Sequence, residues 1–186
     1  MRLYALCDQD SLNKHSVSIE SFVDIATKNN AEIIQYRNKN ASSQDVKKVL
    51  ITLRTLWSGF LIANDHIELC SFCDGIHLGQ EDLKKIDSNE QKAIKIVREV
   101  IGSEKIIGLS THNKQEVEIA NSLELNYVGL GAFRTTSTKN VDNILGEKLD
   151  KIAGFSKHPV AAIGGVTFND SFKNVTYHVI GSALLS

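Results

Sequence analysis

The sequence predicts an α/β protein of the TIM (β/α)8-barrel class, folded as one domain over residues 1–186, with short or missing last helices. Eight short runs rich in β-branched residues alternate with amphipathic stretches along the chain. The runs are apolar throughout instead of alternating with polar residues, which is typical of a parallel sheet covered by helices. Eight such units favour a closed barrel over an open doubly wound sheet. No Gly-x-Gly-x-x-Gly follows the first run, which weakens the open-sheet alternative.

Each expected strand ends in glycine or a polar residue. In chain order the strands are Leu3–Cys7, Glu32–Tyr36, Phe60–Ala63, Gly75–Leu78, Ile106–Leu109, Tyr127–Gly131, Val160–Ile163 and Tyr177–Ile180.

Four of the intervening stretches have apolar residues at helical spacing and recognisable ends. The first begins at Ser42 with Asp45 in a capping-box-like start, the second ends at Gly102, and the third opens at Asn113 with Glu116. The apolar residues of the first stretch are Val46, Val49, Leu50, Leu53 and Leu56, and those of the second are Ala93, Val97 and Val100. The third has Val117 and Ala120, and the fourth has Leu145, Leu149, Ile152 and Ala153.

Composition excludes several classes of function. A net charge of −1 provides no basic surface for nucleic acid, and no apolar run reaches the ~20 residues of a membrane span. The first residues read as a strand and not as a signal peptide. Three cysteines, an odd number, indicate reduced thiols in the cytoplasm, and Cys70 and Cys73 are expected to pack in the core.

The most informative segment is Gly129–Lys139. It supplies free backbone amides, clustered hydroxyls and one lysine directly after an expected strand, as a phosphate group requires. Two further glycine-bearing strand ends, Gly164-Gly165 and Gly181, support the same reading. We therefore expect a phosphate site.

Polar residues follow most of the other strands, and in a barrel those strand ends share one rim, where active sites lie. Arg37, Lys39 and Lys139 could supply positive charge for a diphosphate. Asp65 and Asp82 would repel that anion unless a hard cation lay between them, and Mg²⁺ typically uses one or two carboxylates with phosphate oxygens. The rim therefore predicts a magnesium–diphosphate site beside a second phosphate pocket.

These residues resemble the thiamin phosphate synthase and thiazole tautomerase superfamily, and most closely its synthases. The resemblance runs from Tyr4 to about Leu184. Its motifs are Gln35-Tyr36-Arg37-Asn38-Lys39, Ile62-Ala63-Asn64-Asp65, Asp74-Gly75-Ile76-His77-Leu78-Gly79-Gln80-Glu81-Asp82, Gly108-Leu109-Ser110, Thr136-Ser137-Thr138-Lys139 and Ala162-Ile163-Gly164-Gly165.

The resemblance implies a transferase that couples hydroxymethylpyrimidine diphosphate with thiazole phosphate and releases pyrophosphate. Two carboxylates, Asp65 and Asp82, would hold Mg²⁺, and Gln35 would lie near the pyrimidine. The implied diphosphate ligands are Arg37, Lys39, Asn64, Ser110 and Lys139, of which Arg37, Ser110 and Lys139 would be catalytic. The implied thiazole phosphate ligands are Thr136, Thr138 and the amides around Gly165 and Gly181.

Two other functions stay open. A thiazole tautomerase would use a histidine such as His112 for proton transfer. The combination of Lys39, Asp65 and Asp82 favours the synthase, because a tautomerase has no diphosphate or metal to hold. His77 fits a hydrogen-bonded core histidine better than a general base. The second alternative is a paralogue that binds a thiamin precursor without turnover.

The last two helices are expected to be deficient. Residues 167–175 leave room for only a very short helix, and the five residues after Gly181 form about one turn at ~3.6 residues per turn. We expect the outward faces of the last and first strands to be left open and covered by a second copy of the chain in a homo-oligomer.

Overall fold

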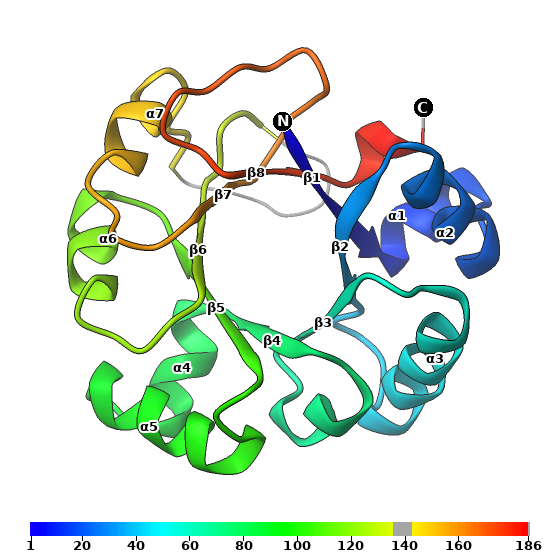
Figure 1. Cartoon of the computed structure of the whole chain (residues 1–186), viewed down its shortest axis with the longest axis horizontal. Coiled ribbons are helices and arrows are strands. Elements are labelled where there is room, and N and C mark those ends of the chain that lie inside the picture. Colours follow the sequence, from blue (N-terminus) through cyan, green and yellow to red (C-terminus); the bar gives the residue numbers. More distant parts are fainter. Residues whose placement is uncertain (136–142, 186) are drawn as a thin grey trace.

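The computed structural model, which describes residues 1–135 and 143–185, contains a closed barrel of eight parallel strands in sequence order (Figure 1). Every neighbouring pair is parallel, including β8 with β1. The (β/α)8 prediction is thereby confirmed. The strands are β1 (Arg2–Asp8), β2 (Ala31–Arg37), β3 (Phe60–Asn64), β4 (Gly75–Leu78), β5 (Ile106–Thr111), β6 (Tyr127–Leu130), β7 (Val160–Ala162) and β8 (Tyr177–Ile180).

Helices surround the barrel unevenly (Figure 1). In the described part of the chain, none of them is long and apolar enough to span a membrane. The α-helices are α1 (Gln9–His15), α2 (Ile19–Lys28), α3 (Ser43–Leu56), α4 (Gln80–Ile86), α5 (Glu90–Ile101), α6 (Lys114–Ala120) and α7 (Lys148–Ala153). Two short 3-10 helices are η1 (Ile67–Phe72) and η2 (Ser182–Leu184).

Helix ends follow the local sequence. Ser42 caps α3 by accepting a hydrogen bond from the Asp45 amide, and Asn113 caps α6 by accepting one from Glu116. Gly102 ends α5 with φ +91°, a conformation that favours glycine. These three ends match the sequence expectation. Val100, however, is 63% exposed and lies outside the buried stripe of α5.

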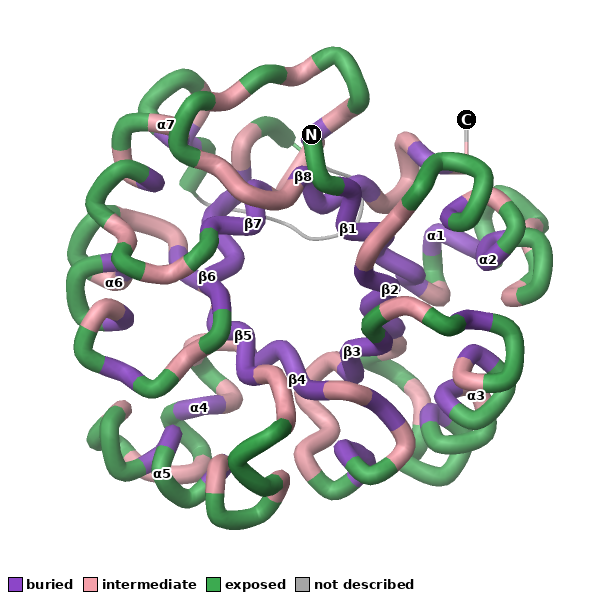
Figure 2. The backbone as a smooth tube through the Cα atoms, in the orientation of Figure 1, coloured by how far each residue is buried: buried purple, intermediate pink, exposed green. Residues whose placement is uncertain are grey.

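Burial divides the core into two layers (Figure 2). One lies between the strands and the helices, and it includes Leu50 and Val97. The other fills the barrel, with Tyr4, Ile62 and Tyr127 among its buried side chains. Burying an aliphatic side chain contributes ~1.5–3 kcal/mol, so these layers fix the positions of the strand ends.

The side of the barrel near β7 and β8 corrects one expectation. The loop 163–176 between these strands contains no helix, and η2 is the last helical turn, as predicted. Yet the outward residues Leu3 and Ala5 of β1 and Ile180 of β8 are at most 2% exposed. Phe172 of the loop packs edge-on against His178, with ring centroids 5.1 Å apart. The flanks are therefore covered within the chain by irregular backbone, and the expectation that they are open is wrong.

Candidate functional site

A cavity of about 430 Å³ opens at the carboxyl ends of the strands. Every predicted site residue that the structure describes lines it: Gln35, Arg37, Lys39, Asn64, Asp65, Asp82, Ser110, Gly165 and Gly181. Three further predicted residues, Thr136, Thr138 and Lys139, lie outside the described residues. The topology thus gathers residues more than a hundred positions apart in the sequence around one space.

The carboxylates of Asp65 and Asp82 both lie close to Gly79, the residue that precedes α4. The Gly79 amide donates to Asp65 Oδ1 at 3.3 Å, and a Cβ on Gly79 would lie only 2.9 Å from Asp82 Oδ2. Asp65 has φ +63°, a left-handed conformation that aspartate tolerates at low cost. Asp82 stands in the first turn of α4 and pairs with Lys85 at 2.8 Å. The absence of a side chain at Gly79 lets the two acids approach each other.

The electrostatics of this pair fit a divalent cation. Burial and then the charge of Asp82 raise the pKa of Asp65, while Lys39 opposes that shift. A cation between the acids would remove this repulsion. Among the described residues no cluster of three or more His, Cys, Asp or Glu side chains could hold a metal. A magnesium ion here would therefore take oxygen ligands from water and substrate as well, as this ion usually does.

The predicted cation Arg37 has a partner that the sequence reading missed. Its guanidinium forms an ion pair with Asp8, a carboxylate only 2% exposed at the end of β1. Asp8 also caps α1, accepting from the Ser11 amide at 3.0 Å. A buried ion pair fixes the direction of the arginine and reduces the net positive charge it brings to the cavity.

The floor of the cavity is a layer of hydrogen-bonded polar side chains. Gln35 Nε2 donates to Asn64 Oδ1 at 2.8 Å, and Asn64 in turn donates to Asp65. On the neighbouring strands β4 and β5, His77 Nε2 and Ser110 Oγ lie 2.9 Å apart. His77 is 6% exposed, which agrees with its interpretation as a hydrogen-bonded core histidine, although it also lines the cavity.

The other side of the cavity is built largely from backbone. Gly164 and Gly165 have φ of +88° and +68°, and a Cβ on Gly164 would lie 2.5 Å from Ala132 Cβ. Arg134 ties this loop down by donating to Asp170 at 2.8 Å and to the Gly165 carbonyl at 2.9 Å. The glycines allow the two loops to approach each other closely at this wall of the cavity.

His112 forms a dyad with Glu116. Its Nδ1 lies 2.9 Å from Glu116 Oε2, and its backbone amide donates to the same oxygen at 2.8 Å. Burial pushes the pKa of Glu116 upward, but the hydrogen bonds from His112 lower it overall. A carboxylate at Nδ1 leaves Nε2 for other partners, an arrangement typical of histidines that transfer protons.

Ser182 is a second site residue that the sequence reading missed. It lines the cavity beside Gly181. The signal was available for both omissions: β1 ends in the acid Asp8, and a serine follows the last strand glycine. The expected core packing of Cys70 and Cys73 is confirmed, because both are buried, as is Cys7, and all three are free cysteines.

Comparison with known proteins agrees with this geometry. The family model described as thiamine monophosphate synthase matches residues 3–186. A thiamine-phosphate synthase of Persephonella marina is 36% identical over 172 residues, covering 89% of this chain and 77% of the relative. One of Lawsonia intracellularis is 37% identical over 173 residues, covering 88% and 74%. The solved thiamine phosphate pyrophosphorylase of Pyrococcus furiosus superposes with a TM-score of 0.79 at 25% identity, covering 99% of this chain and 87% of that one. The chain belongs to the thiamine monophosphate synthase family.

Proposed function

We propose that the protein is a thiamine phosphate synthase, a transferase that joins hydroxymethylpyrimidine diphosphate to thiazole phosphate and releases pyrophosphate. The observation that carries the proposal is the composition of the cavity. Asp65 and Asp82 meet over Gly79 on one side, and the loops of Gly165 and Gly181 supply backbone on the other. One cavity thus offers two different sites for anionic groups, as a reaction between two phosphorylated substrates requires.

The diphosphate binds on the side of β2 to β5. Lys39 reaches it from the end of β2, and Arg37, held by Asp8, presents its guanidinium in a fixed orientation. Asn64 and Ser110 provide polar contacts, and Gln35 faces the pyrimidine ring. Lys139 completes the set of cations, and Thr136 and Thr138 join Gly165 and Gly181 at the thiazole phosphate.

Asp65 and Asp82 would hold a magnesium ion, and the remaining ligands would come from water and substrate oxygens. When bound, the ion neutralises the charge that develops on the departing pyrophosphate. The Gly79 amide and the Asn64 side chain fix the direction of the Asp65 carboxylate through hydrogen bonds, and Lys85 donates to Asp82 at 2.8 Å.

The reaction is a dissociative substitution at the methylene carbon of the pyrimidine. The carbon–oxygen bond to the diphosphate breaks, the aminopyrimidine stabilises the cation, and the thiazole nitrogen forms the new carbon–nitrogen bond. Such a step depends on stabilising the leaving group and on positioning, and it requires no strong base. Fixed cations on one side and a backbone pocket on the other meet those requirements.

The direct test combines purified protein, Mg²⁺ and both phosphorylated precursors, and detects thiamin phosphate and pyrophosphate in equal amounts. Omission of either precursor should abolish both products. Binding of either precursor without product would instead identify a non-catalytic paralogue. If neither precursor binds, the assignment of the cavity is wrong.

A thiazole tautomerase is the second candidate, and the His112–Glu116 dyad favours it. Its substrate would be a thiazole carboxylate phosphate isomerised by proton transfer at His112. The acids Asp65 and Asp82 argue for the synthase, since this isomerisation involves neither diphosphate nor metal. Incubation of the protein with the thiazole carboxylate phosphate alone distinguishes the two activities.

Cytoplasmic location and self-association complete the proposal. The buried free thiols of Cys7, Cys70 and Cys73 are consistent with a reducing compartment. A homo-oligomer stays a prediction. Sedimentation at low micromolar concentration measures the state, and a stable, active monomer would contradict it.

A further inference from the structure

A continuous chain of hydrogen bonds crosses the barrel interior beneath the cavity, with side chains from β1 to β6. In order, its members are Ser110, His77, Tyr127, Tyr4, Gln35, Asn64 and Asp65. The links from Ser110 to Asn64 are each 2.8–2.9 Å long. Tyr4, Tyr127, His77 and Gln35 are at most 6% exposed, so protein groups decide the direction of these bonds.

The Asp65 carboxylate sets the direction at one end. An ionised carboxylate only accepts, so Asn64 presents its Nδ2 to Asp65 and its Oδ1 to Gln35. Gln35 then donates through Nε2, which leaves its Oε1 to accept from the Tyr4 hydroxyl. This first half of the chain has one consistent arrangement.

The same reasoning fixes the second half. Tyr4 has one hydroxyl hydrogen, already given to Gln35, so Tyr127 donates to Tyr4 across their 2.8 Å contact. Tyr127 has then used its hydrogen, and it accepts from His77 Nδ1 at 2.9 Å. A neutral His77 with its hydrogen on Nδ1 accepts at Nε2, so Ser110 Oγ donates to it. Every bond points from Ser110 toward Asp65.

Two strand glycines make room for the middle of this chain. A Cβ on Gly108 would lie 2.1 Å from Cζ of Tyr127, and one on Gly129 would lie 2.9 Å from Cε1 of His77. The His77 and Tyr127 rings stack with centroids 5.5 Å apart. Any larger residue at either glycine would displace a ring, so the backbone itself is shaped around the Tyr127–His77 contact.

We propose that Tyr127 is a positioning residue of the enzyme. It touches neither substrate, but it holds His77 in the Nδ1–H form and so turns the Ser110 hydroxyl inward, toward Nε2. With its hydrogen held by His77, the Ser110 oxygen offers acceptor lone pairs to the cavity in one orientation before substrate binds, which suits a bound cation or a donor group of the pyrimidine and not a phosphate oxygen. The expected effect of Tyr127 on the reaction rate rests on the proposed function, whereas its expected effect on the tautomer of His77 does not.

The test measures the tautomer directly. Protein labelled with ¹⁵N-histidine gives long-range ¹H–¹⁵N correlations that distinguish a protonated ring nitrogen from an unprotonated one, and a His77→Gln variant assigns the His77 signals. In the unaltered protein we expect the hydrogen on Nδ1. In Tyr127→Phe, which keeps the ring and removes the hydroxyl, we expect that preference to be lost and kcat/KM to fall about tenfold, mainly through kcat.

Tyr177→Phe is the matched control. Tyr177 also packs in the barrel interior, edge-on to Tyr4 with centroids 6.5 Å apart, but its hydroxyl is not a member of the chain. Neither the His77 signals nor kcat/KM should change in that variant.

The inference is overturned if His77 of the unaltered protein carries its hydrogen on Nε2, or if Tyr127→Phe changes neither the tautomer nor the rate. Should Tyr127→Phe fail to fold, the spectrum of the unaltered protein alone decides the matter. A protein without synthase activity that nevertheless shows the Nδ1–H form would refute the proposed function and support the chain.

Discussion

The two sides of the cavity are built in different ways. From β1 to β5 the strands are mostly longer, reaching seven residues in β1 and β2, and the polar groups are side chains held by other side chains. From β6 to β8 the strands have three or four residues, and the described cavity wall is rich in glycine, with Gly129, Gly131, Gly164, Gly165 and Gly181. No helix lies between β7 and β8 in the described chain (Figure 1).

The difference shows what each half of the site needs. The proposed metal and diphosphate would require carboxylates and cations in fixed directions, and the buried Asp8 and the half-buried Asn64 hold Arg37 and Asp65 in such directions. A single phosphate group can be bound by amides, which need only correct backbone conformation. The second half can therefore lose helices and keep its function while its loops remain closed by contacts such as Arg134–Asp170.

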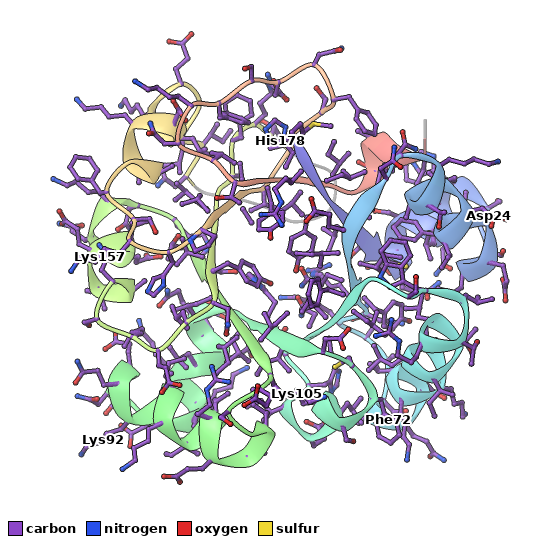
Figure 3. All side chains as sticks on the ribbon, in the orientation of Figure 1. Asp24, Phe72, Lys92, Lys105, Lys157 and His178 are labelled. Atoms are coloured by element: carbon purple, nitrogen blue, oxygen red, sulfur yellow. The ribbon has the colours of Figure 1, made fainter. Side chains whose placement is uncertain are left out.

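The largest effect is expected from removing a carboxylate on the β1–β5 side of the cavity, where the polar groups are side chains. Asp65→Asn and Asp82→Asn should each reduce magnesium-dependent synthesis by about a hundredfold or more, because loss of a direct ligand exceeds the 10–100-fold typical of its supporting groups. Both variants should stay folded, as measured by circular dichroism. Asp24→Asn on the exposed side of α2 is the control (Figure 3). Full turnover with the same metal dependence in either variant would show that its assignment as a ligand is wrong.

A substitution on the β6–β8 side of the cavity should weaken the binding of thiazole phosphate. Gly164→Ala forces an L side chain into φ +88° and against Ala132, at a cost of about 1–3 kcal/mol in unfolding free energy. We expect the KM for thiazole phosphate to rise more than that for the diphosphate. Gly102→Ala is the control. Its φ of +91° imposes a similar backbone strain, but a Cβ at Gly102 would have open space around it, and the residue lies at the end of α5. If both variants changed the thiazole phosphate KM equally, a general loss of stability would explain the effect.

Substitutions at three residues, Lys39, Lys139 and His112, should separate the synthase from the tautomerase. Lys39→Ala removes a charge beside the diphosphate and should weaken its use more than tenfold, and we expect the same of Lys139→Ala. His112→Ala should leave synthesis within about tenfold, a loss of at most ~1.4 kcal/mol of transition-state stabilisation. Steady-state kinetics with both precursors check this. A large loss at His112 with unaffected lysine variants would instead assign the protein to the tautomerase branch.

The smallest effect concerns the stability of the backbone half. His178 on β8 is 5% exposed, its Nδ1 has no hydrogen-bond partner among the described residues, and burial lowers its pKa (Figure 3). The unfolded chain, with a histidine pKa of about 6.5, therefore binds this proton more readily. Stability attributable to His178 is present above pH ~6.5 and is lost as the pH falls below it, by at most ~1.4 kcal/mol per pH unit.

Denaturant unfolding between pH 7.5 and 5 measures this dependence. A His178→Leu variant should lose less stability over that range than the unaltered protein. An identical slope in the two proteins would show that His178 does not contribute.

The sequence predicted the strands and most residues of the site, but not how the side chains of the site pair with each other. Apolar runs and glycine ends predicted all eight strands, because buried parallel strands carry that pattern directly. Most site residues followed from the rule that strand ends share a rim. The pairing of Arg37 with Asp8 did not, because it depends on the register of the neighbouring strands β1 and β2. The chain through Tyr4 and Tyr127 did not either, because it depends on which inward side chains face each other across the barrel. The closure of the β7–β8 flank by Phe172 likewise lies in irregular backbone that no periodic pattern describes.

The most direct test of the two-sided site is calorimetric titration of each substrate alone, with Mg²⁺ and then with a chelator. The account predicts that affinity for hydroxymethylpyrimidine diphosphate falls when magnesium is removed, whereas affinity for thiazole phosphate does not change. It also predicts that Asp65→Asn reproduces the effect of the chelator on the first substrate only. Metal-independent binding of the diphosphate, or an equal loss for both substrates, would contradict the division of the cavity into a metal side and a backbone side.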